Sequence, residues 1–160
     1  MRTWSDDDVQ ELLDKQALND LLVRYCRGVD RLDEELILSC YHLDAYDDHG
    51  RVKGTPANLV AWLKSSAATV SFMEHKLSNV FLDIRGDVAF GESYSAMHLK
   101  KGDLFAQGFG RFIDRFERRN GEWKIARRQV TLEWASPELG YDSADFAPSR
   151  RDRSDPSYER

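Results

Sequence analysis

The spacing of apolar residues changes near the middle of the chain, and this change constrains the fold more than any other feature. In the first half, apolar residues recur three and four positions apart, as they do on one face of a helix. Ser5 and the aspartates after it predict the start of a long helix, and Gly28 predicts either its end or a looser last turn. Two shorter helices are expected after Asp33 and from Pro56, with a short strand in residues 41–51 between them.

The second half predicts a meander of four strands. Apolar and polar residues alternate there, and glycine-containing turn sequences interrupt the alternation. The expected strands span residues 72–84, 88–100, 104–119 and 122–135. Helices followed by antiparallel strands predict an α+β fold, with the helices packed on one face of a curved and mostly antiparallel sheet.

Size and charge narrow the classes of protein that fit the sequence. The 160 residues suffice for one domain, which we place at residues 1–135, and a charged tail at 136–160 is expected to be mobile or to pack on a neighbouring subunit. The net charge of −5 argues against a nucleic-acid partner. The sequence shows neither a membrane-spanning run nor a signal peptide, so we expect no membrane association and a cytoplasmic protein.

One histidine is predicted to point inward from the first long strand. The odd positions of that strand, such as Met73 and Leu77, carry most of its apolar side chains, so His75 and Asn79 share the inward face. A buried imidazole must find a hydrogen-bond partner. A backbone carbonyl would make His75 a structural residue, whereas a carboxylate would make it a candidate base.

Asp30 is the carboxylate that we expect to meet His75. If the first helix breaks near Gly28, the chain after it can direct Asp30 into the space between helix and sheet. A carboxylate that holds one imidazole nitrogen fixes the tautomer and raises the basicity of the other nitrogen. Such a pair suits the removal of a proton from carbon. Asp30 can instead cap the next helix, although Asp33 is better placed for that.

Three short motifs follow one another along the chain. They are Tyr-x4-Asp at the end of the first long helix, His-x3-Asn on the first long strand, and the hairpin Phe-Glu-Arg-Arg-Asn-Gly-Glu-Trp-Lys-Ile at 116–125. In this order they resemble the SnoaL-like branch of the NTF2-like superfamily, and within it the hexachlorocyclohexane dehydrochlorinases, bile-acid 7α-dehydratases and scytalone dehydratases. The resemblance covers about residues 8–135. It implies a cone-shaped, cystatin-like fold whose open end admits an apolar small molecule.

The resemblance also implies roles for individual residues. Asp30 and His75 match the Asp–His pair that performs a cofactor-free elimination in these enzymes. Tyr25 matches a tyrosine of the dehydratases that hydrogen-bonds a substrate oxygen, and Arg128 matches an active-site arginine of the dehydrochlorinase. The bile-acid enzyme takes its arginine from the position of Leu132, so the resemblance does not fix the polar contacts of the substrate.

The residues themselves leave the role of Arg128 open. The apolar parity of the last strand changes near Arg127 and Arg128, which indicates a bulge or a strand buried on both sides. One of these arginines can then face the cavity, or both can lie at the surface in ion pairs.

Further residues are candidates for lining the cavity. Asn79 is expected on the inward face of its strand, and Tyr46 and His49 are expected at the cavity mouth. Four aromatic residues are also candidates, although each can instead fill the core: Trp62, Phe81, Phe112 and Trp134. The histidines and aspartates of residues 42–49 could ligate a metal, but their spacing fits no standard pattern. We therefore expect neither a metal nor another cofactor.

These features predict a cofactor-independent lyase of the dehydratase type, or an isomerase, that acts on a hydrophobic cyclic small molecule. Two alternatives stay open: a non-catalytic protein that binds a small ligand, and a small-subunit-like component of a ring-hydroxylating dioxygenase. The non-catalytic alternative predicts that Asp30 and His75 lie too far apart for a hydrogen bond. The resemblance also implies a homo-oligomer, either a dimer or a trimer.

Overall fold

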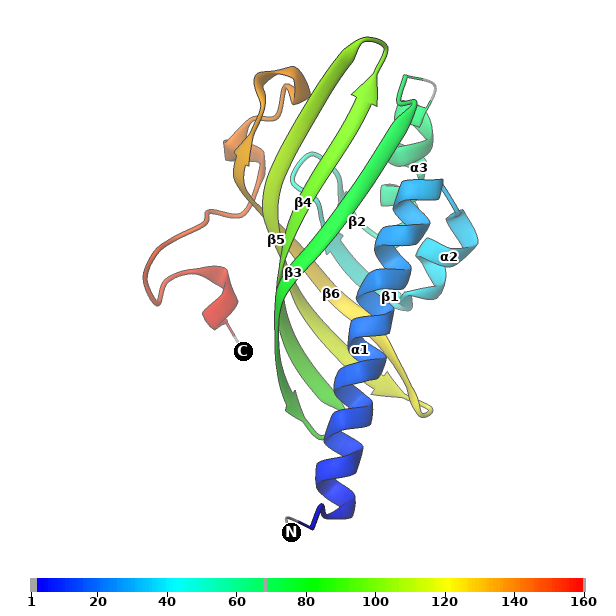
Figure 1. Cartoon of the computed structure of the whole chain (residues 1–160), viewed down its shortest axis with the longest axis vertical. Coiled ribbons are helices and arrows are strands. Elements are labelled where there is room, and N and C mark those ends of the chain that lie inside the picture. Colours follow the sequence, from blue (N-terminus) through cyan, green and yellow to red (C-terminus); the bar gives the residue numbers. More distant parts are fainter. Residues whose placement is uncertain (1–2, 68, 160) are drawn as a thin grey trace.

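The computed structural model describes residues 3–67 and 69–159, in which helices come first and long strands follow (Figure 1). The main elements are α1 (Asp6–Arg31), α2 (Glu34–Ser39), β1 (Tyr41–Asp48), β2 (Lys53–Gly54), α3 (Pro56–Ala67), β3 (Phe72–Arg85), β4 (Val88–Lys101), β5 (Leu104–Arg119) and β6 (Glu122–Ala135). Short 3₁₀ helices follow at Pro137–Leu139, Ser143–Asp145 and Pro156–Tyr158. The long strands agree with their predicted bounds to within one residue. No helix in the described ranges is long and apolar enough to cross a membrane.

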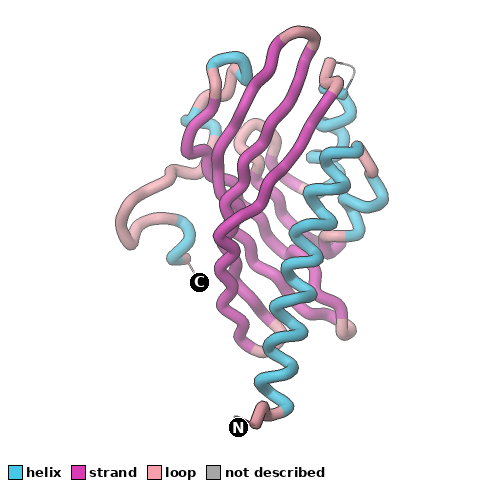
Figure 2. Tube along the Cα trace, in the orientation of Figure 1, coloured by secondary structure: helices cyan, strands magenta, loops and turns pink. Residues whose placement is uncertain are grey.

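The strands of the described residues form one six-stranded sheet, in the order β2-β1-β6-β5-β4-β3. β3 to β6 make an antiparallel meander, whereas β1 runs parallel to β6. The helices lie on one face of the curved sheet, and α1 extends along β3 (Figures 1 and 2). Buried apolar residues of the helices and of that face form a shared core. This arrangement confirms the predicted α+β class.

α1 begins where the sequence predicts and ends later than expected. The Ser5 side chain accepts a hydrogen bond from the backbone N–H of Asp8, and the Asp8 carboxylate accepts one from the backbone N–H of Ser5. The helix continues through Gly28 to Arg31 and is capped by Leu32, which has a positive φ of 52°. A Cβ at Gly28 would lie 2.9 Å from the Ile37 side chain of α2. The glycine therefore permits close helix packing, and the predicted helix end at Gly28 is wrong.

A bulge in β3 changes which side chains face the core. Asn79 has a positive φ of 50°, and the pairing of β3 with β4 shifts between Ser78 and Phe81. The inward face is carried by odd positions such as His75 before the bulge and by even positions such as Leu82 after it. Asn79 and Phe81 are consequently exposed, which corrects the prediction that they line the cavity.

A second bulge lies in β6. In the pairing with β5, Ala126 is an extra residue between the paired Ile125 and Arg127. The bulge turns Arg128 inward, where it is fully buried, and leaves Arg127 exposed. It confirms that the parity of the strand changes at the two arginines.

A third irregularity separates Trp134 from the cavity. Phe109 pairs with Trp134 and Gly110 pairs with Leu132, so Glu133 is the extra residue. Trp134 is 53% exposed and is not a lining residue of the pocket, whereas Leu132 lines it. The predicted cavity role of Trp134 is corrected for this reason.

The C-terminal arm (residues 136–159) lies against its own chain. Arg111 of β5 donates hydrogen bonds to both carboxylate oxygens of Asp155, at 2.9 and 2.8 Å. Phe146 packs against the core, and Tyr141 and Phe146 both reach the pocket described below. The sequence predicted a mobile tail or contact with a neighbouring subunit, whereas the arm forms part of the pocket wall in this structure.

Gly110→Ala is expected to lower the free energy of unfolding by about 1–3 kcal/mol, the usual range for overpacking. A Cβ at Gly110 would lie 2.2 Å from the backbone oxygen of Thr131. Gly108→Ala is the control, because its Cβ would meet only the side-chain ends of Leu139 and Met97, at 3.2 and 3.4 Å. Urea denaturation followed by circular dichroism compares the two variants. Equal losses of stability would contradict the packing argument.

Candidate active site

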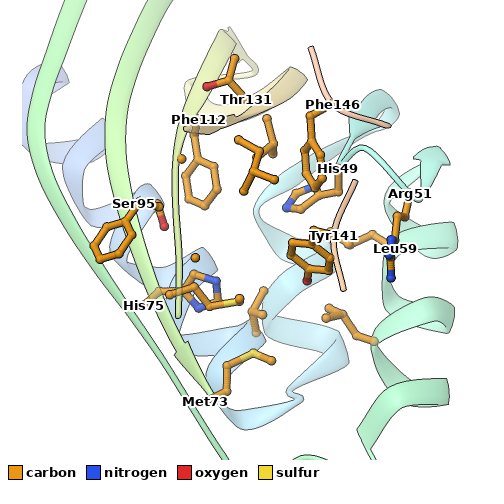
Figure 3. A pocket seen from close by; sticks show the side chains of 18 of the residues that line it. His49, Arg51, Leu59, Met73, His75, Ser95, Phe112, Thr131, Tyr141 and Phe146 are labelled. Carbon is orange, nitrogen blue, oxygen red and sulfur yellow. The ribbon is translucent and has the colours of Figure 1, made fainter. Parts of the chain in front are cut away.

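A largely apolar pocket lies between the helices and the sheet, with a cavity volume of about 100 Å³ (Figure 3). Because polar groups are few on its walls, their positions indicate how a ligand would be oriented. The lining residues are Tyr25, Val29, His49, Arg51, Leu59, Trp62, Leu63, Met73, His75, Ser95, Met97, Gly108, Phe109, Gly110, Phe112, Val130, Thr131, Leu132, Tyr141 and Phe146.

His75 and Asp30 meet at one wall of the pocket. His75 Nδ1 lies 2.6 Å from Asp30 Oδ1, and the backbone N–H of His75 donates to Asp30 Oδ2 at 3.0 Å. The two side chains are only 10% and 14% exposed. With the Nδ1 proton directed at the carboxylate, Nε2 is left to accept a proton from a ligand. The large separation predicted by the non-catalytic alternative is therefore wrong.

Asp30 reaches His75 from an unbroken helix. Tyr25 and Asp30 point about 140° apart on an ideal helix, so one flat surface could not receive both. The sheet curves around α1, and the two side chains contact different parts of it. Tyr25 bonds to His49 after β1, and Asp30 bonds to His75 on β3.

A second Asp–His pair lies on another side of the pocket. His49 Nδ1 is hydrogen bonded to Asp47 Oδ1, and His49 Nε2 lies 3.0 Å from the Tyr25 hydroxyl. The Tyr41 hydroxyl donates to Asp47 Oδ2 at 2.5 Å. Burial opposes ionisation of Asp47, but the charge of His49 and the hydrogen bonds from His49 and Tyr41 outweigh it and hold the pKa of Asp47 below its ordinary value. Asp47 was considered from sequence only as a metal ligand, although strand alternation places it on the same side as His49.

Arg128 lies behind the pocket wall. Its guanidinium makes two hydrogen bonds of 2.7 Å to the Asp114 carboxylate, and its Cζ lies 4.2 Å from the ring centres of Tyr25 and Phe112. Burial opposes the charge on Arg128, yet the Asp114 carboxylate outweighs burial and holds the pKa of Arg128 well above its ordinary range. Arg128 is not a lining residue, so the place in the cavity wall that the resemblance implied for it is corrected. The rings of Tyr25 and Phe112 separate its positive charge from the pocket on this side.

The other predicted lining residues divide into two groups. Trp62 and Phe112 line the pocket, as do Tyr25 and His49. Tyr46 is 42% exposed and lies under the Arg127 guanidinium, 5.6 Å from its Cζ, so its predicted place at the cavity mouth is corrected.

Several lining residues were missed by the sequence analysis. Met73 shares the inward parity of His75, and Ser95 and Met97 alternate in the same way on β4, so alternation alone identifies their face. Tyr141 and Phe146 come from the C-terminal arm, whose irregular sequence has no periodicity that would place them.

The acidic and histidine-rich stretch of residues 42–49 makes other contacts. His42 Nε2 bonds to the backbone oxygen of Glu117, and Asp44 pairs with Arg119. Within residues 3–67 and 69–159, no three or more His, Cys, Asp or Glu side chains are grouped so as to hold a metal ion. His42 and Asp44 are thus paired with groups of the protein itself.

The protein-family model that describes the SnoaL-like domain matches residues 10–129, which is most of the chain. The chain belongs to the SnoaL-like family. No curated protein matches the sequence. The family assignment and the architecture agree with the fold expected from the three motifs.

Solved structures similar to this SnoaL-like protein share its fold. One, which its name assigns provisionally to the scytalone dehydratases, comes from Novosphingobium aromaticivorans and aligns with a TM-score of 0.73 and 16% identity over 79% of this chain and 88% of its own. The hexachlorocyclohexane dehydrochlorinase of Novosphingobium barchaimii gives 0.71 and 21% over 81% and 92%. A Nostoc punctiforme protein with a cystatin-like fold gives 0.64 and 22% over 76% and 92%. The fold is thus the cystatin-like, NTF2-like one predicted from sequence.

Asp114→Ala is expected to lower the free energy of unfolding by about 3–5 kcal/mol, because it leaves the buried charge of Arg128 unpaired. Lys64→Ala is the matched control, since its ion pair with Glu34 is exposed and such pairs contribute about 0–1 kcal/mol. Chemical denaturation measures both variants. A loss in Asp114→Ala no larger than that in Lys64→Ala would contradict the importance of the buried pair.

Proposed function

We propose that the protein is a cofactor-independent lyase that removes water from a hydrophobic cyclic small molecule, or an isomerase that uses the same base. The observation that carries this proposal is the direct bond between Asp30 and His75 at the wall of an apolar pocket. The SnoaL-like family and the named dehydratase and dehydrochlorinase neighbours support an elimination.

His75 acts as the general base in this proposal. Asp30 accepts a hydrogen bond from the Nδ1–H group, which fixes the tautomer of the ring and leaves the Nε2 lone pair available. The second bond, from the His75 backbone N–H to Asp30, prevents the carboxylate from turning away. The proton to be removed lies on a carbon beside a carbonyl group or opposite a leaving group. General-base catalysis of this kind contributes about 10²- to 10⁴-fold to a rate.

Tyr25 binds the departing hydroxyl or the activating carbonyl. Burial raises the pKa of Tyr25 well above its ordinary value, so the side chain remains a neutral hydrogen-bond donor. The guanidinium of Arg128 lies against the Tyr25 ring and favours negative charge that develops on the bound oxygen. Trp62 and Phe112 supply apolar contacts for the rest of the ligand.

The oligomeric state is a separate proposal. Phe81 and Tyr94 are 51% and 44% exposed on the face of the sheet away from the helices. A second copy of the chain would bury such apolar surface, so we expect a homo-oligomer, either a dimer or a trimer. Light scattering measures its mass, and co-purification of a larger chain would instead favour the dioxygenase-component alternative.

His75→Ala and Asp30→Asn are expected to lower kcat about 10²- to 10⁴-fold, with ligand affinity nearly unchanged, because they remove the base or its orientation. Mass spectrometry of small molecules retained by the native protein identifies a ligand, and turnover of that compound is then assayed. His98→Ala is the control, because His98 stacks on Phe105 away from the pocket. Wild-type kcat in His75→Ala would refute the proposed base.

A further inference from the structure

The Asp47–His49 pair reaches the pocket but has no role in the function proposed above. Asp47 is 1% exposed, whereas the His49 side chain is 17% exposed and lines the pocket. Figure 3 shows the His49 and His75 rings on different sides of the pocket, both directed into it. The pocket therefore has two carboxylate-held imidazoles that face the same space.

The second pair is continued by a hydroxyl. Asp47 holds His49 Nδ1, His49 Nε2 lies 3.0 Å from the Tyr25 hydroxyl, and Tyr25 itself lines the pocket. The Tyr41 hydroxyl fixes the second oxygen of Asp47. Asp47, His49 and Tyr25 thus form one hydrogen-bonded chain that runs from the interior to the ligand space. We call it the Tyr25 relay.

The two imidazoles differ in what their second nitrogen meets. No hydrogen bond of the described residues involves Nε2 of His75, whereas Nε2 of His49 faces the Tyr25 oxygen. His49 also lies in a cluster with two buried carboxylates, Asp47 and Asp114, and one guanidinium, Arg128. His49 therefore contacts the Tyr25 hydroxyl and a buried carboxylate at the same time, so it can connect the two.

Tyr25 needs such a donor if it is to give up its own proton. Burial makes its phenolate unfavourable, so a proton that leaves Oη must be replaced in the same step. His49 Nε2 lies 3.0 Å from that oxygen, so a proton on this nitrogen would be in place to replace the one that leaves. If Tyr25 and His49 were purely structural, the hydrogen bond between them would be their whole role, and no proton would need to move along it.

We propose that the Tyr25 relay protonates an oxygen leaving group on a different side of the pocket from His75, so that the substrate carries a hydroxyl or a similar oxygen substituent rather than a halide. This inference rests on the proposed function, because it supplies the acid that complements the proposed base. A halide leaves as a stable anion and has no need of a proton, whereas hydroxide is a poor leaving group until it is protonated.

For a substrate with a ring hydroxyl, the proposed elimination begins at the carbon that bears the proton. Nε2 of His75 takes the proton from carbon, and the C–H electron pair becomes the new C=C bond. The C–O bond breaks with its electrons on oxygen, which takes the proton of Tyr25. Tyr25 in turn takes the proton from His49 Nε2, and water leaves. His75 ends protonated and His49 neutral, and exchange with solvent returns both to their starting states.

A series of 1,2-benzisoxazoles tests the relay without knowledge of the natural substrate. A base removes the C3 proton of these compounds, the N–O bond breaks, and the ring opens to a 2-hydroxybenzonitrile. Ring substituents grade the basicity of the leaving phenolic oxygen. The dependence of rate on that basicity, followed by absorbance, reports how far the protein protonates the oxygen.

The wild type is expected to be faster than His75→Ala on the whole series and to depend weakly on the leaving group. His49→Phe should slow the most basic leaving group about 10- to 100-fold and the least basic by less than about twofold. Tyr25→Phe should give the same pattern. The double variant should lose little more, because the two residues act in one chain.

His49→Gln separates proton transfer from positioning. The amide keeps an N–H donor for Tyr25 but has no ionisable proton, so this variant should behave like His49→Phe. Wild-type rates in His49→Gln would overturn the relay and leave His49 a positioning residue. His98→Phe is the control, since it removes an imidazole outside the pocket and should leave all rates unchanged.

The outcomes distinguish the relay from the base. A wild type no faster than His75→Ala across the series would overturn the proposed base, and the relay with it. If the wild type exceeds His75→Ala while His49→Phe slows all members equally or none, the relay alone is overturned.

Discussion

The hydrogen bonds between Asp30 and His75 tie the last turn of α1 to β3, and the geometry of the pocket depends on them. One carboxylate accepts both the ring N–H and the backbone N–H of His75, at 2.6 and 3.0 Å. The ring orientation is therefore set by the packing of a helix on a strand rather than by a loop. α1 continues unbroken past Gly28, and its last turn is closed by hydrogen bonds from the backbone N–H groups of Leu32 and Asp33 to the Gly28 carbonyl, so it can serve as a support for Asp30.

Another side of the pocket depends on a buried ion pair behind its wall. Arg128 and Asp114 are fully enclosed, and the desolvation of both charges is offset by two short hydrogen bonds and by aromatic rings on the guanidinium. Tyr25 lies between this pair and the ligand space. In the proposed reaction, His75 on one wall and the Tyr25 hydroxyl on another would separate the two charges that an elimination develops.

Strand alternation correctly predicted most of the sheet, and the residues that it misplaced share one physical cause. It located the four long strands and turned His75 inward, because alternation persists as long as the pairing register does. At Asn79 the backbone takes a positive φ, the register shifts, and every later side chain changes sides. Phe81 and Trp134 were misplaced by such bulges, which no local pattern marked clearly.

The contribution of the C-terminal arm was also beyond sequence. Tyr141 and Phe146 reach the pocket in a segment that Arg51 holds through Tyr141 and Asp145 and that pairs with Thr131 at Ala147, contacts that an irregular sequence does not reveal. The proposed role of His75 as a base depends on one tautomer of its neutral ring. ¹⁵N NMR measures that tautomer directly. We predict a proton on Nδ1 and none on Nε2, with this preference lost in Asp30→Asn. A ring protonated on Nε2, or one insensitive to Asp30→Asn, would contradict the account.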